Sequence, residues 1–493
     1  MRLSALMLSV FAFWFAFGGG LEWRLPKGAV REGDILSVRL ENNGTSMATA
    51  PLELSAYVGK VLKVTVKCRG ENVAPGPQHW LGFKFMISYT DAVTGAKSWP
   101  GANCESGSWD WKTVEILMDL RRVKPEMEGL SLGIQDSRGF VQFDLSTLKF
   151  ETVKPLFEYD TSTEKCVYTD RVKTRQIRRG VMLPANACKE DDFMTLRDWG
   201  ATLARYQMVR RWNAKNDNTN VAEYVSWVDS KIDHLLNEVL PWAEKYGIEV
   251  VVDLHVPPGG RREDGDMNMF YDEKYANVFI DVWKRIATRC RDRKGIWGYD
   301  LINEPCQKHQ GAENCDYWTL QKRVAEAVRK IDPVTPIVIE SSGWDSPTEF
   351  PIMHVLDMPD VIYQAHMYMP HEFTHQGVHG KWKPIAYPNA EKGWDREYLR
   401  RCLQPVLDFQ RRHDAKIYIG EFSAIAWAEG PAEYLKDCIS IFEEYGWDWT
   451  YHAFREWSGW SVEHDAQTPG KFASSADNPR KRALLKGFRN AKK

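Results

Sequence analysis

The sequence predicts an α/β protein in which a (β/α)8 TIM barrel follows an all-β, jelly-roll-like sandwich domain. Length is the first observation, because 493 residues are too many for one ordinary core and favour two domains. Patterning is the second, since short apolar runs in the first part give way to strand-like runs that alternate with amphipathic segments. Composition is the third: 43% hydrophobic and 27% charged residues indicate folded domains.

Residues 1–20 have the pattern of a secretory signal peptide. Arg2 supplies a positive charge, an apolar stretch runs from Leu3 to Phe17, and three glycines follow as a cleavage region. A membrane anchor is the alternative, but about 15 apolar residues are short for a span, which needs roughly 20. We therefore expect a secreted, extracellular protein with no membrane attachment after cleavage.

Residues 21–152 form the predicted β-sandwich. Runs such as "ILSVRL", "KVLKVTVKC" and "VQFDLSTLKF" are separated by Gly, Pro and Asn, and they show little helical periodicity. The segment resembles the carbohydrate-binding modules that precede many secreted glycanases. Its tryptophans are candidates either for a sugar platform or for strand packing: Trp80, Trp99, Trp109 and Trp111.

Residues 153–176 are charged and contain Pro155, which suits a linker, and residues 177–493 form the predicted catalytic barrel. Eight strand-like runs follow one another: "RRGVML", "GATLARYQMV", "IEVVVDLHV", "GIWGYDLINE", "TPIVIES", "DVIYQAHMY", "AKIYIGEF" and "WTYHAF". Helical segments lie between most of them, for instance 221–246, 271–293, 317–331 and 396–412. A doubly wound sheet is the alternative fold, but no Gly-rich phosphate loop follows the first strand.

Polar residues recur near the ends of these runs, where a barrel places its functional side chains. They are Arg205, His255, Asn303, Glu304, His366, Tyr368 and Glu421. Each alone suits an ordinary structural role, such as a carboxylate at a helix N-terminus or a histidine in a core. Together they favour function, because two carboxylates on different strands that face one cleft are what glycosidic cleavage needs.

Four segments identify the family that the barrel resembles. "YDLINEP", "YIGEF", "VVDLHVPPGG" and "QAHMY" are similar to the signature strands of glycoside hydrolase family 5, the cellulase family. The resemblance covers about residues 177–488. It implies a retaining mechanism in which Glu304 acts as the general acid and base and Glu421 attacks the anomeric carbon.

The resemblance also implies the roles of the remaining residues. Asn303 would hold the 2-hydroxyl of the sugar, while Arg205 and Tyr368 would support the nucleophile. His255 and His366 would contact the sugar or orient the acid/base residue. These residues require no cofactor and no metal.

The stacking platform is where the sequence departs from the family pattern. Many members carry a tryptophan within the eighth strand, whereas "WTYHAF" has His452 and Phe454 there. The next tryptophans are Trp457 and Trp460, of which we favour Trp457 as the platform.

Several other features bear on alternative functions. "HEFTH" (371–375) matches a zinc-protease pattern, but Pro370 and Gly377 leave too short a window for the helix that this motif requires. The nine cysteines show no zinc-ribbon spacing, and Cys306 with Cys315 is the best candidate for a disulfide, two free thiols being the alternative. A net charge of -2 without a basic tract indicates no nucleic-acid partner.

The sequence therefore predicts a secreted, monomeric retaining β-glycanase. An endo-β-1,4-glucanase is the leading hypothesis, and its substrate would be a polysaccharide, β-glucan or β-mannan. A β-1,4-mannanase or another family 5 β-glycosidase is the enzymatic alternative. A carbohydrate-binding protein without activity is the remote one, and the presence of both Glu304 and Glu421 argues against it.

Overall fold

The computed structural model describes residues 20–78, 80–92, 97–102, 106–184, 188–210, 218–380 and 382–489. The predicted signal peptide, residues 1–20, lies outside the described residues except for Gly20. The chain divides into two compact units, Met1–Pro155 and Leu156–Lys493. Among the described residues, no helix combines the length and apolar character that a membrane crossing would need.

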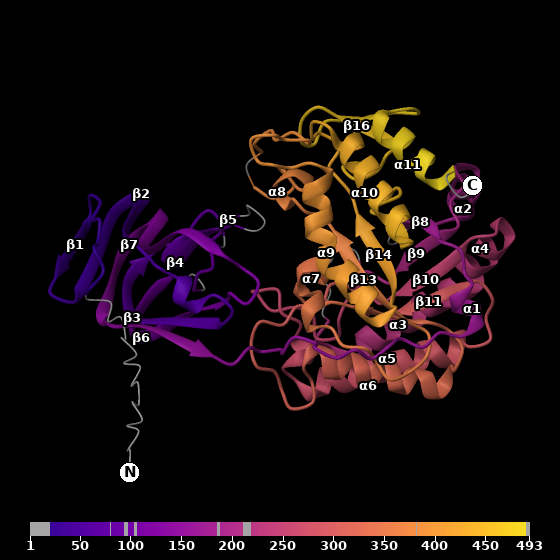
Figure 1. Cartoon of the computed structure of the whole chain (residues 1–493), viewed down its shortest axis with the longest axis horizontal. Coiled ribbons are helices and arrows are strands. Elements are labelled where there is room, and N and C mark those ends of the chain that lie inside the picture. Colours follow the sequence, from indigo (N-terminus) through magenta and orange to yellow (C-terminus); the bar gives the residue numbers. More distant parts are fainter. Residues whose placement is uncertain are drawn as a thin grey trace, which may run out of the picture. The chain divides into compact units, whose positions relative to one another are not determined.

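The first unit is an antiparallel β domain (Figure 1). Its strands are β1 (Ala29–Glu32), β2 (Ile35–Pro51), β3 (Val61–Val73), β4 (Gly82–Asp91), β5 (Lys97–Ser98), β6 (Gly107–Asp119) and β7 (Pro125–Val153), with a 3-10 turn, η2, at Ser55–Tyr57. The long β7 pairs with β4 through its first half and with β3 through its second half. Phe83 of β4 packs against Phe143 of β7 and Trp109 of β6, with ring centroids 5.5 and 5.6 Å apart. These contacts belong to the buried core of one seven-stranded antiparallel sheet, which confirms the predicted all-β domain.

The second unit contains a closed barrel of eight parallel strands, in the order β10-β11-β12-β13-β14-β15-β8-β9. The strands are β8 (Arg179–Met182), β9 (Leu203–Gln207), β10 (Glu249–Asp253), β11 (Ile296–Asp300), β12 (Ile337–Glu340), β13 (Val361–Met367), β14 (Lys416–Phe422) and β15 (Asp448–Tyr451). Seven of the eight predicted strand runs contain one of them, and the eighth, 449–454, overlaps β15 at residues 449–451. The predicted TIM barrel is therefore confirmed.

Helices surround the barrel strands, as Figure 1 shows for α5, α6, α9 and α10. The longer ones are α2 (Glu190–Trp199), α3 (Val221–His234), α4 (Leu240–Tyr246), α5 (Glu273–Cys290), α6 (Tyr317–Ile331), α9 (Arg396–His413), α10 (Pro431–Tyr445) and α11 (Pro479–Arg489). A π turn, η3 (Leu235–Val239), joins α3 to α4. Short elements are α1 (Asp170–Lys173), η4 (Asn268–Phe270), α7 (Ser342–Asp345), η5 (Pro347–Ile352), α8 (His371–Thr374), β16 (His464–Ala466) and β17 (Phe472–Ser474).

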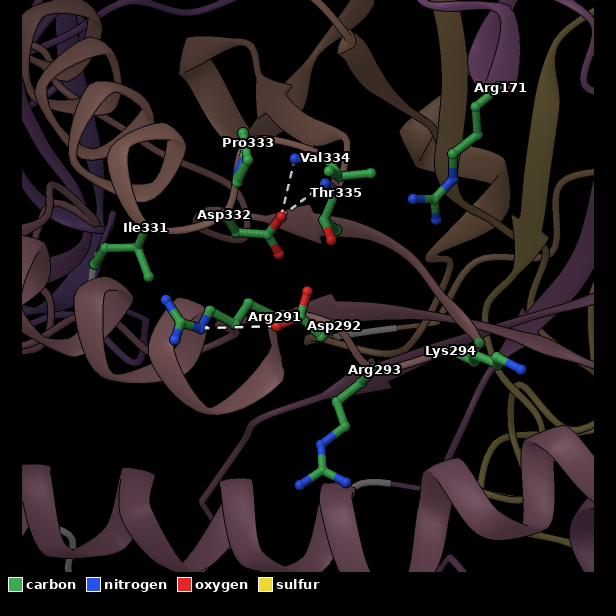
Figure 2. A pocket seen from close by; sticks show the side chains of 11 residues that line it. Arg171, Arg291, Asp292, Arg293, Lys294, Ile331, Asp332, Pro333, Val334 and Thr335 are labelled. Atoms are coloured by element: carbon green, nitrogen blue, oxygen red, sulfur yellow. Dashed lines mark hydrogen bonds and ion pairs between the residues drawn. The ribbon is translucent and has the colours of Figure 1, made fainter.

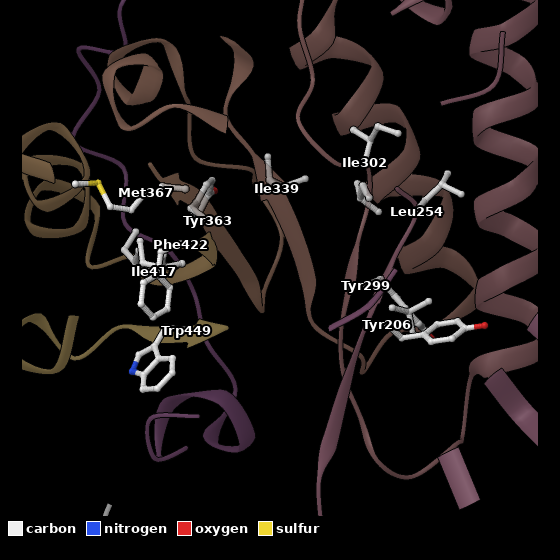
Figure 3. Close-up of a cluster of buried hydrophobic side chains, with 14 of the residues drawn as sticks. Tyr206, Leu254, Tyr299, Ile302, Ile339, Tyr363, Met367, Ile417, Phe422 and Trp449 are labelled. Carbon is white, nitrogen blue, oxygen red and sulfur yellow. The ribbon is translucent and has the colours of Figure 1, made fainter. Parts of the chain in front are cut away.

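Helix α5 illustrates how the sequence specifies these helices. Asp272 caps it by accepting a hydrogen bond from the backbone N–H of Lys274. The buried positions Ala276, Phe279, Trp283 and Ile286 recur at three- and four-residue intervals, so that one face packs on the barrel. Figure 3 shows part of the core between strands and helices, including Tyr206 of β9 and Trp449 of β15.

The barrel interior has two layers because alternate residues of a strand point inward. The lower layer is apolar and consists of Leu203, Val251, Trp297, Val338, Ile362 and Tyr418. On several strands the residue two positions further along is polar: Arg205, Asp253, Glu340 and Gln364, all buried. Because the apolar residues are buried in the barrel, the polar residues two positions further along the same strands also point inward. They form a polar layer beneath the open end of the barrel.

The candidate disulfide between Cys306 and Cys315 is not formed. Both are free, buried thiols. The Cys306 Sγ donates to Asp266 Oδ1 at 3.6 Å, and the Cys315 Sγ accepts from Arg323 at 4.0 Å. The two sulfurs therefore have separate polar partners, one of them in helix α6.

Candidate active site

A pocket of about 860 Å³ lies over the carboxyl ends of the barrel strands. Of the predicted site residues, it is lined by His255, Asn303, Glu304, His366, Tyr368, Glu421 and Trp457. Arg205 lies buried beneath it and donates hydrogen bonds to Glu421 and Asn303. Barrel closure thus brings all eight predicted residues together.

Glu421, within β14, is held at both carboxylate oxygens. Arg205 Nη1 donates to Oε1 at 2.6 Å, and the Tyr368 hydroxyl donates to Oε2 at 2.8 Å. Burial raises the pKa of Glu421, but the charges of His366, His452 and Arg205 outweigh burial and place that pKa well below its usual range. The carboxylate is therefore ionised, and its oxygens are aimed by fixed donors.

The Arg205 guanidinium is fully buried among carboxyl groups. Its Nε donates to Asp300 at 3.0 Å, its Nη2 donates to Glu340 at 2.9 Å, and Asp253 lies 3.4 Å away. Burial lowers the pKa of Arg205, but the neighbouring Asp253, Asp300, Glu421 and Glu340 raise it well above its usual range. The guanidinium therefore stays charged beneath the pocket.

Glu304 lies four residues beyond the end of β11, in a loop and not on the strand itself, with φ at +53°. Its backbone is held from both sides: the N–H donates to Glu340 Oε2 at 2.5 Å, and the carbonyl accepts from Arg261 Nη2 at 2.9 Å. Its side-chain Oε1 lies 3.0 Å from His366 Nδ1. These contacts fix a conformation that is unfavourable for a non-glycine residue.

His366, on β13, lies between the two glutamates. Its Nδ1 is 3.0 Å from Glu304 and 3.8 Å from Glu421. Burial lowers the pKa of His366, but Glu421, the hydrogen bond to Glu304 and Asp345 raise that pKa to about 9. One carboxylate oxygen of Glu304, one of Glu421 and a ring nitrogen of His366 all lie within 4.8 Å of one another. The imidazolium therefore allows two carboxyl groups to approach each other at neutral pH.

Asn303 and His255 are oriented by a chain of contacts. Asp253 Oδ2 lies 2.8 Å from His255 Nδ1, and His255 Nε2 lies 3.3 Å from Asn303 Nδ2. The Asn303 Oδ1 accepts from Arg205 Nη2 at 3.0 Å. Because Asp253 accepts the proton of Nδ1, the Nε2 atom of His255 can accept a hydrogen bond from the Asn303 amide. His255 and Arg205 together fix the orientation of that amide.

Two exposed tryptophans, Trp457 and Trp344, line the pocket. Trp457 is 38% exposed, whereas Trp460, the alternative platform, is only 7% exposed. The rings of Trp427, Trp460 and Phe472 contact the Trp457 ring edge-on, with centroids 5.8–5.9 Å away. Trp344, which the sequence analysis missed, is 43% exposed and lies over the Arg261 guanidinium at 4.4 Å. A tryptophan three residues beyond the end of the fifth strand run was the available signal.

Three buried acids near the site were also missed, because in sequence they are ordinary strand and loop carboxylates. Burial is the main cause that raises the pKa of Asp300 to about 6, that of Asp345 to about 8, and that of Glu340 well above its usual range. The two oxygens of Glu340 accept hydrogen bonds from Arg205 and from the backbone N–H of Glu304.

The segment that matches the zinc-protease pattern forms only the four-residue helix α8. The rings of His371 and His375 stack face to face, with centroids 4.0 Å apart and planes 9° apart. Among the described residues, two groups of side chains lie close enough together to hold a metal ion, Glu304–His366–Glu421 and Glu340–Asp345–His366. Neither His371 nor His375 belongs to them. Both histidines line the pocket as a wall.

A second hollow, of about 510 Å³, lies between the loops that precede β11 and β12, at the opposite end of the barrel. It is lined by Arg171, Arg291, Arg293 and Lys294 among others. Figure 2 shows these side chains extending in different directions from the loops. The basic groups do not converge on a common point, and the hollow lies far from the paired carboxylates.

Comparisons with known proteins agree with this geometry. The family model described as cellulase (glycosyl hydrolase family 5) matches residues 168–458. Endoglucanase C of Acetivibrio thermocellus is 29% identical over 265 residues, which cover 47% of this chain and 75% of that protein. Cellodextrinase A of Ruminococcus flavefaciens is 23% identical over 282 residues, covering 55% of this chain and 80% of that protein. A solved structure described as a glycoside hydrolase shares the fold, with 20% identity, a TM-score of 0.51, and coverage of 63% of this chain and 99% of that one.

Proposed function

The chain belongs to the cellulase family, glycosyl hydrolase family 5, and from that premise we propose that it is a retaining endo-β-1,4-glucanase with Glu421 as nucleophile and Glu304 as general acid and base. The family makes the chain a glycoside hydrolase that acts on polysaccharide. Endoglucanases are among the relatives, which favours a β-1,4-glucan as the substrate.

The separation of the two glutamates carries the mechanistic part of the proposal. One oxygen of each carboxyl group lies within 4.8 Å of the other and of His366. Retaining glycosidases place their carboxyl groups about 5–5.5 Å apart, whereas inverting enzymes need about 6.5–9.5 Å to admit a water molecule. The narrow gap favours direct attack by a carboxylate on the sugar.

In the first step, Glu421 attacks the anomeric carbon while Glu304 gives its proton to the departing glycosidic oxygen. Glu421 is suited to attack because it is ionised and its oxygens are aimed by Arg205 and Tyr368. The C–O bond to the leaving group breaks as the glycosyl-Glu421 ester forms. Asn303, beside Glu421, holds the 2-hydroxyl of the reacting sugar.

In the second step, Glu304 removes a proton from water, and the resulting nucleophile displaces Glu421. The imidazolium of His366 lies between the two carboxyl groups and stabilises the negative charge that passes from one to the other. Two inversions at the anomeric carbon leave the product with the configuration of the substrate.

The stereochemical course tests the mechanism. Proton NMR of the first minutes of hydrolysis should show β-anomeric product before mutarotation, and initial α product would refute the assignment of Glu421 as nucleophile. Reducing-sugar release from carboxymethyl cellulose, mannan, xyloglucan and mixed-linkage glucan tests the substrate. Mannan as the preferred polymer would make the chain a β-mannanase with the same residues.

We extend the proposal to the β-sandwich as a polysaccharide-binding module. Trp80, Trp99 and Trp111 are 45%, 55% and 39% exposed, which suits sugar stacking, whereas Trp109 packs on Phe83. Removal of residues 21–152 should lower affinity for insoluble polysaccharide more than turnover of soluble substrate. An isolated sandwich that does not pull down with cellulose would make it a structural domain.

Export and a monomeric state complete the proposal, and both rest on the sequence. The apolar pattern of residues 1–20 supports secretion. Activity confined to the cell fraction of a secreting host would contradict it, and a size-exclusion profile with light scattering tests the monomer.

A further inference from the structure

The wall of the pocket at the end of β15 is polar where an aromatic platform is expected. His452 directly follows Tyr451, the last residue of β15, and both His452 and Glu456 line the pocket. Strand β15 neighbours β14, which carries Glu421, on the side away from β13 and His366. Because Glu304 acts on the leaving group from the side of His366, the sugar that Glu421 attacks extends toward β15.

Glu456 is held through one of its two oxygens. Its Oε2 accepts from Gln207 Nε2 at 2.7 Å and lies 3.6 Å from His452 Nε2. Its Oε1 accepts no hydrogen bond from the described residues and is not among their enclosed polar atoms, and the side chain keeps 13% of its surface open. The carboxylate is thus fixed in place with one oxygen toward the pocket.

His452 is presented in the same way. Its ring packs against Trp460 and Tyr368, with centroids 5.5 and 6.1 Å apart. The 3.6 Å separation from Glu456 is longer than a hydrogen bond, so Nε2 keeps the capacity to donate to a ligand. A carboxylate oxygen and an imidazole N–H side by side match a hydroxyl group, which donates to one and accepts from the other.

The charges agree with that geometry. Burial raises the pKa of Glu456, but the charge of His452 and the hydrogen bond from Gln207 lower it below its usual range. Burial lowers the pKa of His452, but Glu421 and Glu456 raise it. An ionised carboxylate in a largely enclosed site makes strong, charge-assisted hydrogen bonds, and it is costly to leave unpaired when a ligand displaces water.

We propose that Glu456, held by Gln207 and paired with His452, binds a hydroxyl group of the sugar that Glu421 attacks, so that this subsite selects its sugar by hydrogen bonding and not by stacking alone. The inference rests on the proposed hydrolase function. The hydroxyl is the 3- or 6-hydroxyl, because Asn303 serves the 2-hydroxyl and the 4-oxygen of an internal sugar is bonded to the next residue of the chain.

A panel of substrates that each lack one hydroxyl tests this. Aryl β-glycosides of the disaccharide that the wild type hydrolyses, with the 2-, 3- or 6-hydroxyl of the proximal sugar removed, are assayed for kcat/KM with the wild type, Glu456→Ala and Glu456→Gln. Glu463→Gln is the matched control, because Glu463 lies in the same segment but pairs with Arg455 and does not line the pocket.

On the intact substrate, Glu456→Ala should lose roughly 10- to 100-fold in kcat/KM, the range for one lost hydrogen bond to a charged group. That loss should disappear on the 3-deoxy or the 6-deoxy substrate and persist on the 2-deoxy substrate. Glu456→Gln keeps an acceptor oxygen and should lose less, and Glu463→Gln should match the wild type throughout.

Equal losses on every deoxy substrate, or no loss in Glu456→Ala, would overturn the inference while leaving the hydrolase function standing. A wild type that hydrolyses no β-glycoside would overturn both. Because a folding defect would lower activity on all substrates alike, the dependence on one hydroxyl separates binding from structural damage.

Discussion

Replacing His366 by glutamine removes the imidazole that contacts both glutamates, and it should change how stability depends on pH. A pKa raised from 6.5 to about 9 means that the folded protein binds this proton roughly 300-fold more tightly than the unfolded chain. At about 1.4 kcal/mol per tenfold, the imidazolium contributes about 3 kcal/mol of stability. Since His366 is almost completely buried, solvent screens little of this contribution.

The sign follows from the direction of the pKa change. Because the folded pKa lies above the unfolded one, the contribution is complete below pH 6.5, falls as pH rises, and is lost above about pH 9. Asp345 acts in the same direction up to about pH 8, because its folded pKa is raised from 3.8 to about 8 and the unfolded chain therefore loses this proton first. The Asp345 contribution is present in both proteins, so the difference between the wild type and His366→Gln reports the His366 proton.

Thermal unfolding of the wild type and His366→Gln at intervals from pH 6 to 10 measures this effect. The two curves should differ most near pH 6 and converge above pH 9. His309→Gln serves as the control, because His309 has a 51% exposed side chain and lies outside the pocket. Parallel curves for the wild type and His366→Gln across this range would refute a buried imidazolium between Glu304 and Glu421.

Three further predictions concern the carboxyl groups. Glu421→Ala should lose roughly a thousandfold or more of kcat while its unfolding midpoint stays near that of the wild type, because its carboxylate performs the attack; wild-type-like turnover would exclude it as nucleophile. Glu304→Ala should lose about 10²- to 10⁴-fold on polysaccharide and far less on activated aryl glycosides, and equal losses on both would count against an acid/base role. Glu340→Ala leaves the Glu304 N–H unpaired and should lose about 10- to 100-fold of kcat, whereas Glu340→Gln keeps one acceptor oxygen and should lose less; equal losses in the two variants would contradict the role of that hydrogen bond.

The eight strands and the predicted site residues were accessible from the sequence because both depend on local pattern. Leu203, Arg205 and Gln207 alternate along one strand, so that burial of the leucine fixes the side on which the arginine lies. Parallel strands that close into a barrel bring their carboxyl ends together, whichever helices connect them. The strand assignments follow from these two rules, whereas the choice of Glu304 and Glu421 among the strand-end carboxylates rested on the resemblance to glycoside hydrolase family 5.

The sequence alone indicated the family and the strands, and it predicted the two glutamates, but the tertiary structure decided how each group ionises and which one faces the pocket. Glu340 and Glu456 look alike in sequence, yet burial among acids raises the pKa of Glu340, while the neighbouring His452 lowers the pKa of Glu456. Trp457 and Trp460 differ likewise only in exposure, 38% against 7%. The physical reason is that desolvation and Coulomb energy depend on distances between residues on different strands, such as Arg205 and Glu421, which are 216 positions apart and which barrel closure brings within 2.6 Å.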